Sequence, residues 1–305
     1  NDAFPKSRRW DSDKSGIWER RGESLRELVG EDEYHSIERS RINAFFTTPT
    51  VIRAMWSALE HMGANNIANP QILEPSAGSG RFLGLQPVDM AARSKRTAVE
   101  LDTISARMLK QTYPATTVYG MGYQQAPISN DSIDIAISNV PFANIPVADE
   151  DFTKGSRRLF TTSVHNFFFG KTMDKLRPGG VLAFVTIHGT LDAPSSKPIR
   201  EALADRADFL GAVRLPKNAF PDTEVVTDIV FMRKRMPDEE PSADLSWLDT
   251  ETIQVPGKRK QPDYGSGYRS YGDVQYKEVA FETTKDINRY FIEHPEMVLG
   301  THAAT

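Results

Sequence analysis

The sequence predicts an α/β fold built on a doubly wound, mostly parallel sheet, and two observations carry this prediction. Short apolar runs alternate with segments of helical spacing between residues 49 and 235, and strands that alternate with helices form parallel sheets covered on both faces. The last two apolar runs, 208–215 and 224–235, have no helix between them. We therefore expect these two strands to pair antiparallel at one edge of the sheet.

The elements follow from local signals in order along the chain. A polar, interrupted helix is expected over 17–38, as an arm packed on the main body. A second helix begins at Pro49, with Thr48 able to cap it, and stops at Gly63. Further strands are expected at 71–74, 96–101, 116–120, 132–138 and 180–187, and further helices at 80–86, 103–112, 163–177 and 197–205.

After Met236 the composition changes to a polar extension interrupted by Gly and Pro, with a weak closing helix over 283–292. We therefore divide the chain into an N-terminal helical arm (1–44), a core domain (45–236) and a C-terminal extension (237–305).

The bulk composition is that of an ordinary globular protein, with 39% hydrophobic and 26% charged residues. The 305 residues include no cysteine, which excludes a disulfide framework and a thiolate metal site and suits the cytoplasm, where we expect the protein to act. No uncharged apolar run approaches the roughly 20 residues that span a membrane. The chain begins with neither a signal peptide nor a methionine, which is compatible with a piece of a longer polypeptide.

The net charge of −4 gives no general attraction to nucleic acid. Basic residues are nevertheless clustered, and phosphate contacts need only a local basic face. Each cluster is also compatible with ordinary solvated surface charge. The clusters are Lys6, Arg8 and Arg9; Arg157 and Arg158; Arg233, Lys234 and Arg235; and Lys258, Arg259 and Lys260.

Three strand ends carry residues suited to ligand binding, because ligands of doubly wound sheets lie beyond the carboxyl ends of the strands. The first strand runs into EPSAGSG (74–80), a glycine turn that lets the backbone approach a ligand and leaves helix N–H groups free. The turn lacks the third glycine of a dinucleotide fingerprint and the Lys-Ser/Thr of a phosphate loop. The second strand ends in VELD (99–102), where Glu100 can accept two hydrogen bonds from a ribose and Asp102 suits a helix cap. The fourth ends in NVPF (139–142).

These three motifs in this order resemble the S-adenosylmethionine-dependent N6-adenine DNA methyltransferases, with NVPF in place of the family's Asn/Asp/Ser-Pro-Pro-aromatic motif. The segment FFTTP (45–49) resembles the family's cofactor-closing motif, ahead of the glycine turn as in type I modification subunits. The segments 33–49, 212–235 and HPEMVLG (294–300) resemble the methylase part of large methylase–helicase polypeptides of phages and plasmids. The resemblance covers about residues 33–236 and implies a Rossmann-like class I methyltransferase fold.

The resemblance also implies a cofactor, S-adenosyl-L-methionine, and a set of residues around it. Thr47 and Thr48, with Phe46 alongside, would meet the methionine carboxylate, and Gly122 and Tyr123 would flank the adenine. The whole set expected at the cofactor is Phe46, Thr47, Thr48, Glu74, Ser76, Ala77, Gly78, Gly80, Glu100, Leu101, Gly122, Tyr123 and Asn139. The expected catalytic residues are Asn139, Val140, Pro141 and Phe142, and no metal is expected.

The chemistry of methyl transfer explains the NVPF motif. The N6 lone pair of adenine is conjugated into the ring, so the nitrogen is a poor nucleophile. The side-chain oxygen of Asn139 and the backbone carbonyl of Val140 can accept hydrogen bonds from the amino group and stabilise the positive charge that develops. Phe142 offers a stacking face for a base rotated out of the duplex, and Pro141 fixes the backbone. Val140 replaces the family's first proline, which keeps the carbonyl but loses the φ restraint.

Two further features have open interpretations. The loop 143–160 mixes acids, bases and aromatic residues directly after NVPF, which fits either a mobile lid that faces the target or a surface loop. His165 and His188 lack neighbouring ligands at metal spacing, so we expect structural roles for both.

Three functions remain open from the sequence. The first is an adenine-N6 DNA methyltransferase, as one module of a restriction-modification or defence-type system. The second is an RNA or protein-glutamine methyltransferase, because these enzymes use a similar motif. The third is a catalytically silent module that binds cofactor or DNA. No separate recognition domain is evident in the polar extension, so we expect other domains or subunits to supply target recognition.

Overall fold

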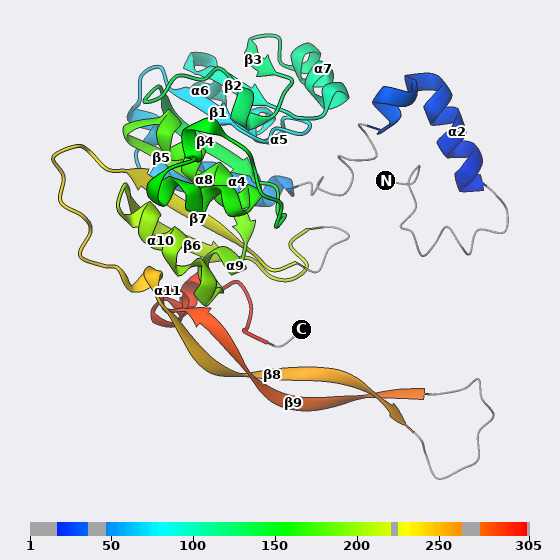
Figure 1. Ribbon diagram of the computed structural model, residues 1–305, viewed down its shortest axis with the longest axis vertical. Helices are drawn as coiled ribbons and strands as arrows, with labels where there is room; N and C mark the ends of the chain where they lie inside the picture. Colours follow the sequence, from blue (N-terminus) through cyan, green and yellow to red (C-terminus); the bar gives the residue numbers. More distant parts are fainter. Residues whose placement is uncertain (1–16, 36–46, 221–224, 264–274, 304–305) are drawn as a thin grey trace.

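The computed structural model describes residues 17–35, 47–220, 225–263 and 275–303. Within these ranges seven strands form one sheet in the order β3-β2-β1-β4-β5-β7-β6 (Figure 1). The strands are β1 (Gln71–Glu74), β2 (Lys95–Val99), β3 (Thr116–Tyr119), β4 (Ile133–Asn139), β5 (Leu176–Ile187), β6 (Ala207–Arg214) and β7 (Thr227–Lys234).

The sheet has the predicted topology. Strands β1 to β5 pair only in parallel with one another, whereas β7 runs antiparallel to both of its neighbours, β5 and β6. The β6–β7 pair therefore forms the expected antiparallel edge, with β6 outermost. The chain leaves β1 in one direction along the sheet and returns at β4 to build the other half, so the topological switch point lies between β1 and β4. This is where an open α/β sheet binds its ligand.

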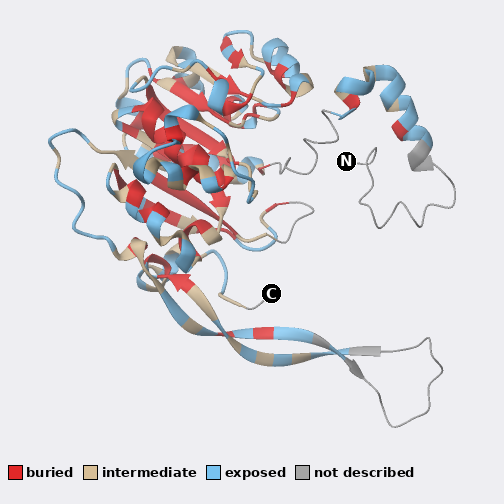
Figure 2. Cartoon of the chain, viewed as in Figure 1, coloured by how far each residue is buried: buried red, intermediate tan, exposed pale blue. Residues whose placement is uncertain are grey.

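Helices cover both faces of the sheet and bury a separate core on each. Successive strand residues point to opposite faces, so Ile72 and Ile135 enter one core while Leu73 and Ala136 enter the other. The first core is covered by α4 (Pro49–His61), α5 (Arg81–Gly84), α6 (Val88–Arg93) and α7 (Thr103–Thr112). The second is covered by α8 (Val164–Lys175), α9 (Gly189–Asp192), α10 (Lys197–Ala204) and α11 (Arg289–Glu293). Figure 2 shows the buried residues concentrated in the sheet between these layers.

The predicted boundaries of α4 are confirmed. Pro49 occupies its first turn, and its apolar stripe of Ile52, Met55, Trp56 and Leu59 is buried. Gly63, with φ of 96°, follows the end of the helix in the left-handed region, which glycine adopts without steric cost. Thr48 is the N-cap residue, but its hydroxyl makes no capping hydrogen bond.

The C-terminal region corrects the sequence prediction. Residues 283–292 were expected to form a helix, but most of them belong to a strand, and α11 spans only Arg289–Glu293. Strand β8 (Thr250–Asp263) pairs antiparallel with β9 (Gln275–Asn288) in continuous register. The pair forms a long ribbon that projects from the domain, as Figure 1 shows. The apolar residues Ile287, Tyr290 and Phe291 suit a helix by spacing, but pairing with β8, distant in sequence, decides the outcome.

The N-terminal arm stands apart from the sheet. Helix α2 (Ile17–Val29) is followed by helical residues 31–35, and Figure 1 shows α2 away from the domain rather than packed on it as expected. An ion pair of 2.5 Å between Arg107 of α7 and Glu33 joins this part to the domain. In the described residues, no helix has both the length and the apolar character to cross a membrane.

Candidate functional site

The glycine turn lies at the switch point, held by the ends of neighbouring strands. The Ala77 N–H donates to the Val99 carbonyl at 2.9 Å, and the Gly78 N–H donates to the Glu100 carboxylate at 2.6 Å. Gly78 and Gly80 have φ of 51° and 73°. A Cβ at Gly80 would lie 2.5 Å from Leu109, so a side chain is excluded there. A Cβ at Gly78 would meet nothing within 4 Å, so the backbone at this position faces open space.

Glu100 stands beside this turn at the end of β2. Its second oxygen accepts from the Asp102 N–H at 2.8 Å, while Asp102 itself caps α7 by accepting from Ser105 at 2.7 Å, as predicted. Burial raises the pKa of Glu100, and the backbone hydrogen bonds from Asp102 and Gly78 offset part of that rise. A carboxylate can accept about four hydrogen bonds, so Glu100 retains acceptor capacity for a ligand. Its neighbour Leu101 is 73% exposed, an apolar surface beside the acid.

Glu74 is placed differently from the other residues of the turn. Its carboxylate is buried and accepts from the Leu83 N–H at 3.2 Å, at the start of α5. Burial raises its pKa well above the ordinary value, while hydrogen bonds from the Leu83 and Phe82 N–H groups oppose the rise. Glu74 thus holds α5 against the end of β1.

The segment ahead of α4 reaches the same region. Arg81 of α5 donates to the Thr47 carbonyl at 3.2 Å. The Thr47 hydroxyl oxygen is buried and has no hydrogen bond among the described residues, and Thr48 does not use its hydroxyl to cap α4. The buried Thr47 hydroxyl is therefore available to a ligand. Phe46 lies outside the described residues.

The NVPF motif leaves β4 next to the glycine turn. The Ser138 hydroxyl donates to the Ser76 carbonyl at 3.2 Å, which joins the two motifs directly. The Val140 N–H donates to the Val185 carbonyl of β5 at 3.1 Å, a bond that proline could not make. Val140 is buried, and the half-buried Phe142 packs against both cores. The interstrand hydrogen bond thus restrains residue 140 in place of a proline ring.

The sequence did not point to Ser138 as part of the site. A fully buried serine near the end of a mostly apolar strand is the signal that could have identified it, because a buried hydroxyl needs a hydrogen-bond partner.

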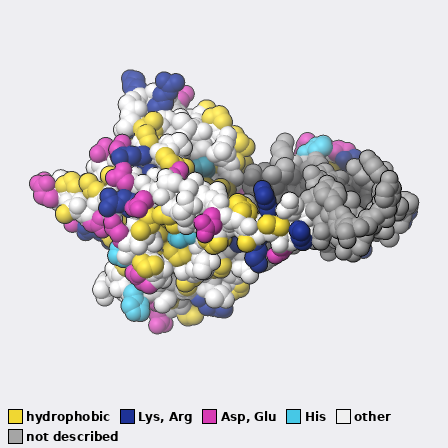
Figure 3. All heavy atoms as spheres, turned by 90° about the horizontal axis from the view of Figure 1, so that it is seen from below, with side chains coloured by type: hydrophobic (Ala, Val, Ile, Leu, Met, Phe, Trp, Pro, Cys, Tyr) yellow, Lys and Arg dark blue, Asp and Glu magenta, His cyan; other side chains and the backbone are white. Residues whose placement is uncertain are grey.

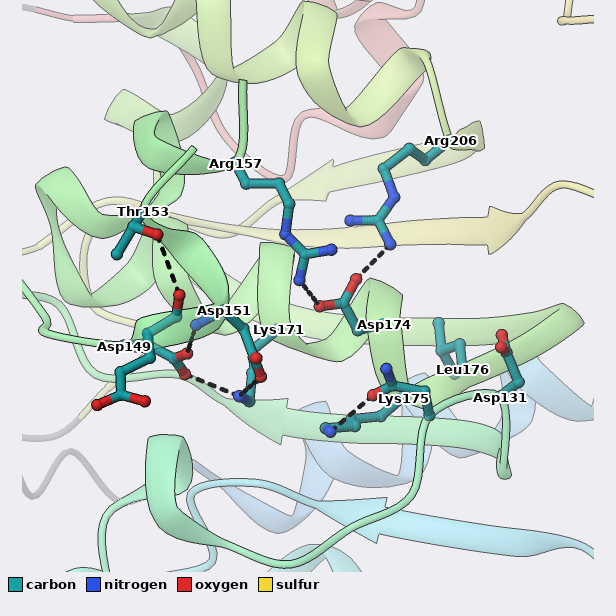
Figure 4. A network of polar contacts seen from close by, with 12 residues as sticks. Asp131, Asp149, Asp151, Thr153, Arg157, Lys171, Asp174, Lys175, Leu176 and Arg206 are labelled. Carbon is teal, nitrogen blue, oxygen red and sulfur yellow. Dashed lines mark hydrogen bonds and ion pairs between the residues drawn. The ribbon is translucent and has the colours of Figure 1, made fainter. Parts of the chain in front are cut away.

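The segment after NVPF is anchored to α8, as Figure 4 shows. The Lys171 ammonium, almost wholly buried, contacts Asp149 at 2.7 Å and Asp151 at 3.4 Å. Arg157 and Arg206 both pair with Asp174 near the end of α8.

Aromatic packing holds the same segment. The Phe152 and Phe160 rings are buried, and the Phe152 ring lies 5.5 Å from that of Phe167, measured between centroids. Residues 147–163 are therefore fixed in the fold rather than free to move as a lid. Residues 144–146 stay exposed beside the motif.

Tyr123 lies in the core. Its hydroxyl group contacts that of Thr172 on α8 at 3.0 Å, and its ring packs 5.1 Å from that of Phe168. Burial raises its pKa above the ordinary range. Gly122 precedes it and is also buried. The Tyr123 side chain thus packs in the core beneath the candidate site. The Gly122–Tyr123 backbone comes shortly after β3 in the chain.

The two histidines have structural contacts. His165 is buried, which lowers its pKa, and its ring contacts the Ser163 hydroxyl at 3.2 Å. His188 contacts Asp192 at 3.2 Å. Throughout the described ranges, no group of three or more acids and histidines could hold a metal ion.

The geometry agrees with the comparisons to known proteins. Residues 32–263 match the model of the N-6 DNA Methylase family. The chain belongs to this family. The match spans the glycine turn, Glu100 and NVPF, the three motifs that meet at the switch point.

Two curated relatives differ in how much of them the chain covers. The chain is 29% identical over 224 residues to Defense against restriction protein B of Escherichia phage P1, across 70% of this chain and 9% of that protein. It is 23% identical over 261 residues to Type II methyltransferase M.CvrRI of Paramecium bursaria Chlorella virus XZ-6E, across 84% of this chain and 65% of that protein. The chain spans less than two thirds of either relative.

A solved structure shows the same fold. The methyltransferase subunit of a type I restriction-modification system from Streptococcus thermophilus superposes with a TM-score of 0.54 at 19% identity, over 63% of this chain and 45% of that one. The sheet is that of the class I S-adenosylmethionine-dependent methyltransferases, as predicted.

Proposed function

We propose that this chain transfers the methyl group of S-adenosylmethionine to the N6 amino group of adenine in DNA, as one module of a larger modification or defence-type system. Membership of the N-6 DNA Methylase family supports the reaction. The small share of the phage protein that the chain covers supports a larger polypeptide. The name of one relative concerns restriction and the name of the other concerns methyl transfer, and both support a role in a modification or defence-type system.

The residues at the switch point fit the cofactor. The buried Thr47 hydroxyl, without a hydrogen bond in the described structure, suits the methionine carboxylate. The open backbone at Gly78 admits a ligand. Glu100 would accept hydrogen bonds from the two ribose hydroxyls of the cofactor, and the exposed Leu101 would offer apolar surface to the cofactor's adenine. When bound, S-adenosylmethionine supplies a methyl group on a positively charged sulfur, which makes it electrophilic.

The chain itself prepares the acceptor. Asn139 stands at the end of β4 beside the glycine turn, so a base held there would have its amino group near the methyl donor. The Asn139 side-chain oxygen and the Val140 carbonyl would accept hydrogen bonds from that group and favour its tetrahedral, positively charged form. N6 would bond to the methyl carbon as the sulfur–carbon bond breaks, with S-adenosylhomocysteine as the leaving group, and the nitrogen would then release one proton to solvent. Phe142 would stack against the base.

The observation that carries the proposal is the direct link between the two motifs, the 3.2 Å hydrogen bond from Ser138 to the Ser76 carbonyl. We would measure transfer of tritiated methyl to DNA, RNA and protein, with digestion of labelled DNA to nucleosides. Label in N6-methyl-2′-deoxyadenosine from DNA is expected. Label in RNA or in protein glutamine alone would support the alternative acceptors instead.

The Asn139→Ala variant separates binding from chemistry. We expect it to keep most of its affinity for S-adenosylmethionine in calorimetry and to lose methyl transfer, because its amide acts on the acceptor nitrogen. Loss of both properties in a variant with a normal melting curve would assign Asn139 to the cofactor.

A silent binding module is the second candidate function. Val140 in place of proline favours it, as does the phage relative, whose name describes defence rather than methylation. Cofactor binding without label in any acceptor would support this candidate.

A further inference from the structure

The β8–β9 ribbon is fixed at its root to the side of the sheet that carries NVPF. Asn288, the last residue of β9, is fully buried, and its amide donates to the Leu191 carbonyl at 2.9 Å and the Trp247 carbonyl at 2.8 Å. Its N–H donates to Asp192 at 2.9 Å. Asp192 in turn pairs with Arg214, at the end of β6.

Asp192 also contacts His188, the residue that follows β5. Strand β5 is the strand that pairs with Asn139. The ribbon therefore leaves the domain from the half of the sheet expected to hold the acceptor base.

The two faces of the ribbon differ in charge. The continuous register places alternate residues on opposite faces. One face has an acid in each of its two end pairs, Glu251 with Ile287 at the root and Asp263 with Gln275 at the tip. Between these end pairs it carries three basic residues and no carboxylate, and we call this part the cationic face. It consists of Ile253, Val255, Gly257, Arg259, Gln261, Lys277, Val279, Phe281, Thr283 and Lys285. The opposite, mixed face carries the carboxylates of Glu278, Glu282 and Asp286 beside Lys258 and Lys260.

The apolar residues of the cationic face are largely covered within the chain. Val255 is only 2% exposed, and the Phe281 ring lies 5.9 Å from the Arg259 guanidinium, which covers it. Arg259 is exposed. What this face offers a partner between its end pairs is thus mainly positive charge, which is complementary to phosphate rather than to an apolar protein surface.

The basic cluster at 233–235, on the body of the protein, is already neutralised. Arg233 pairs with Asp208 and Glu239, Lys234 with Asp131, and Arg235 with Asp208. Figure 3 likewise shows basic and acidic side chains intermixed over the face that it presents. The ribbon therefore carries the stronger candidate for phosphate contacts.

We propose that the β8–β9 ribbon is a duplex-binding arm whose cationic face contacts the DNA that flanks the target adenine. A two-stranded ribbon is marginally stable alone in water, and a partner along its length would stabilise it. Strands of 14 residues reach about 45 Å, longer than one turn of B-DNA. The major groove accommodates a two-stranded ribbon. This inference names the DNA contact for the proposed function and rests on it.

The test compares two charge reversals on adjacent residues of opposite faces. Binding of the full chain to a duplex of roughly 30 base pairs, about three helical turns, is measured at several salt concentrations. Arg259→Glu is expected to weaken binding about tenfold and to lower the slope of log Kd against log salt by about 1. Lys258→Glu changes the net charge equally on the mixed face and is expected to weaken binding clearly less. Replacing residues 256–282 by Asn-Gly, which closes a short hairpin, is expected to remove most duplex affinity.

Each outcome bears on the proposal. Unchanged duplex affinity in Arg259→Glu and in the shortened chain would overturn it and point to a protein partner for the ribbon. Equal losses in Arg259→Glu and Lys258→Glu would also overturn the assignment to one face. All variants are checked for S-adenosylmethionine binding, which should not change. If the wild-type chain binds duplex DNA through the ribbon but transfers no methyl group, the result would contradict the proposed function and leave the role of the ribbon intact.

Discussion

At the scale of single residues, Glu100 shows how one carboxylate organises the candidate site. It accepts hydrogen bonds from the N–H groups of Gly78 and Asp102, so it joins the glycine turn to the start of α7. Its burial raises its pKa, because a buried charge loses hydration. The same side chain therefore shapes the turn and is expected to hold the cofactor's ribose.

We expect Glu100→Ala to weaken S-adenosylmethionine binding by about 10- to 150-fold, since hydrogen bonds to a charged group contribute about 1.5–3 kcal/mol. Glu100→Gln is the matched control that keeps the size of the side chain and should lose less. Isothermal calorimetry measures both. An unchanged dissociation constant in folded Glu100→Ala would remove this residue from the site.

The raised pKa gives the same interaction a pH dependence. Because the pKa of Glu100 lies above its ordinary value of 4.5, the carboxylate should take up its proton at a higher pH than an exposed glutamate. Cofactor affinity should therefore fall as the pH decreases toward that raised pKa, and this component should be absent in Glu100→Gln.

At the scale of elements, the segment between NVPF and α8 is held by a buried ion pair. Lys171 and Asp149 have side chains that are 4% and 2% exposed. Removing one partner of such a pair leaves the other charge buried without compensation. The anchoring of residues 147–163 therefore depends on Lys171.

We expect Lys171→Met to lower the free energy of unfolding by about 3–5 kcal/mol, in urea denaturation. Lys197→Met is the control: its partner is Asp249, both side chains are nearly half exposed, and exposed pairs of this kind contribute little to stability. Similar losses in the two variants would contradict the structural role assigned to the buried pair.

At the scale of the whole molecule, the described residues include one extended ribbon with a cationic face and no further domain for reading base edges. Phosphate contacts are blind to sequence and are screened by salt. We therefore expect the isolated chain to bind duplex DNA weakly, with little sequence preference, and to methylate it only slowly without partner domains.

Filter binding at about 50 and about 200 mM salt should show a loss of affinity of about tenfold or more. Mapping of methylated adenines by sequencing should show no strong site preference. Tight, salt-resistant binding to one short sequence by these residues alone would refute the expectation.

The sequence by itself determined the α/β class, the order of elements to β7 and the three motifs of the switch point, because these depend on local spacing and on strand ends. Only the tertiary structure decided three other features: the β8–β9 ribbon in place of a helix at 283–292, the anchoring of residues 147–163 by Lys171, and the burial of Tyr123. Each depends on partners far apart in the chain. Ile287 suits a helix or a strand equally well by spacing, and pairing of β9 with β8 places it in a strand.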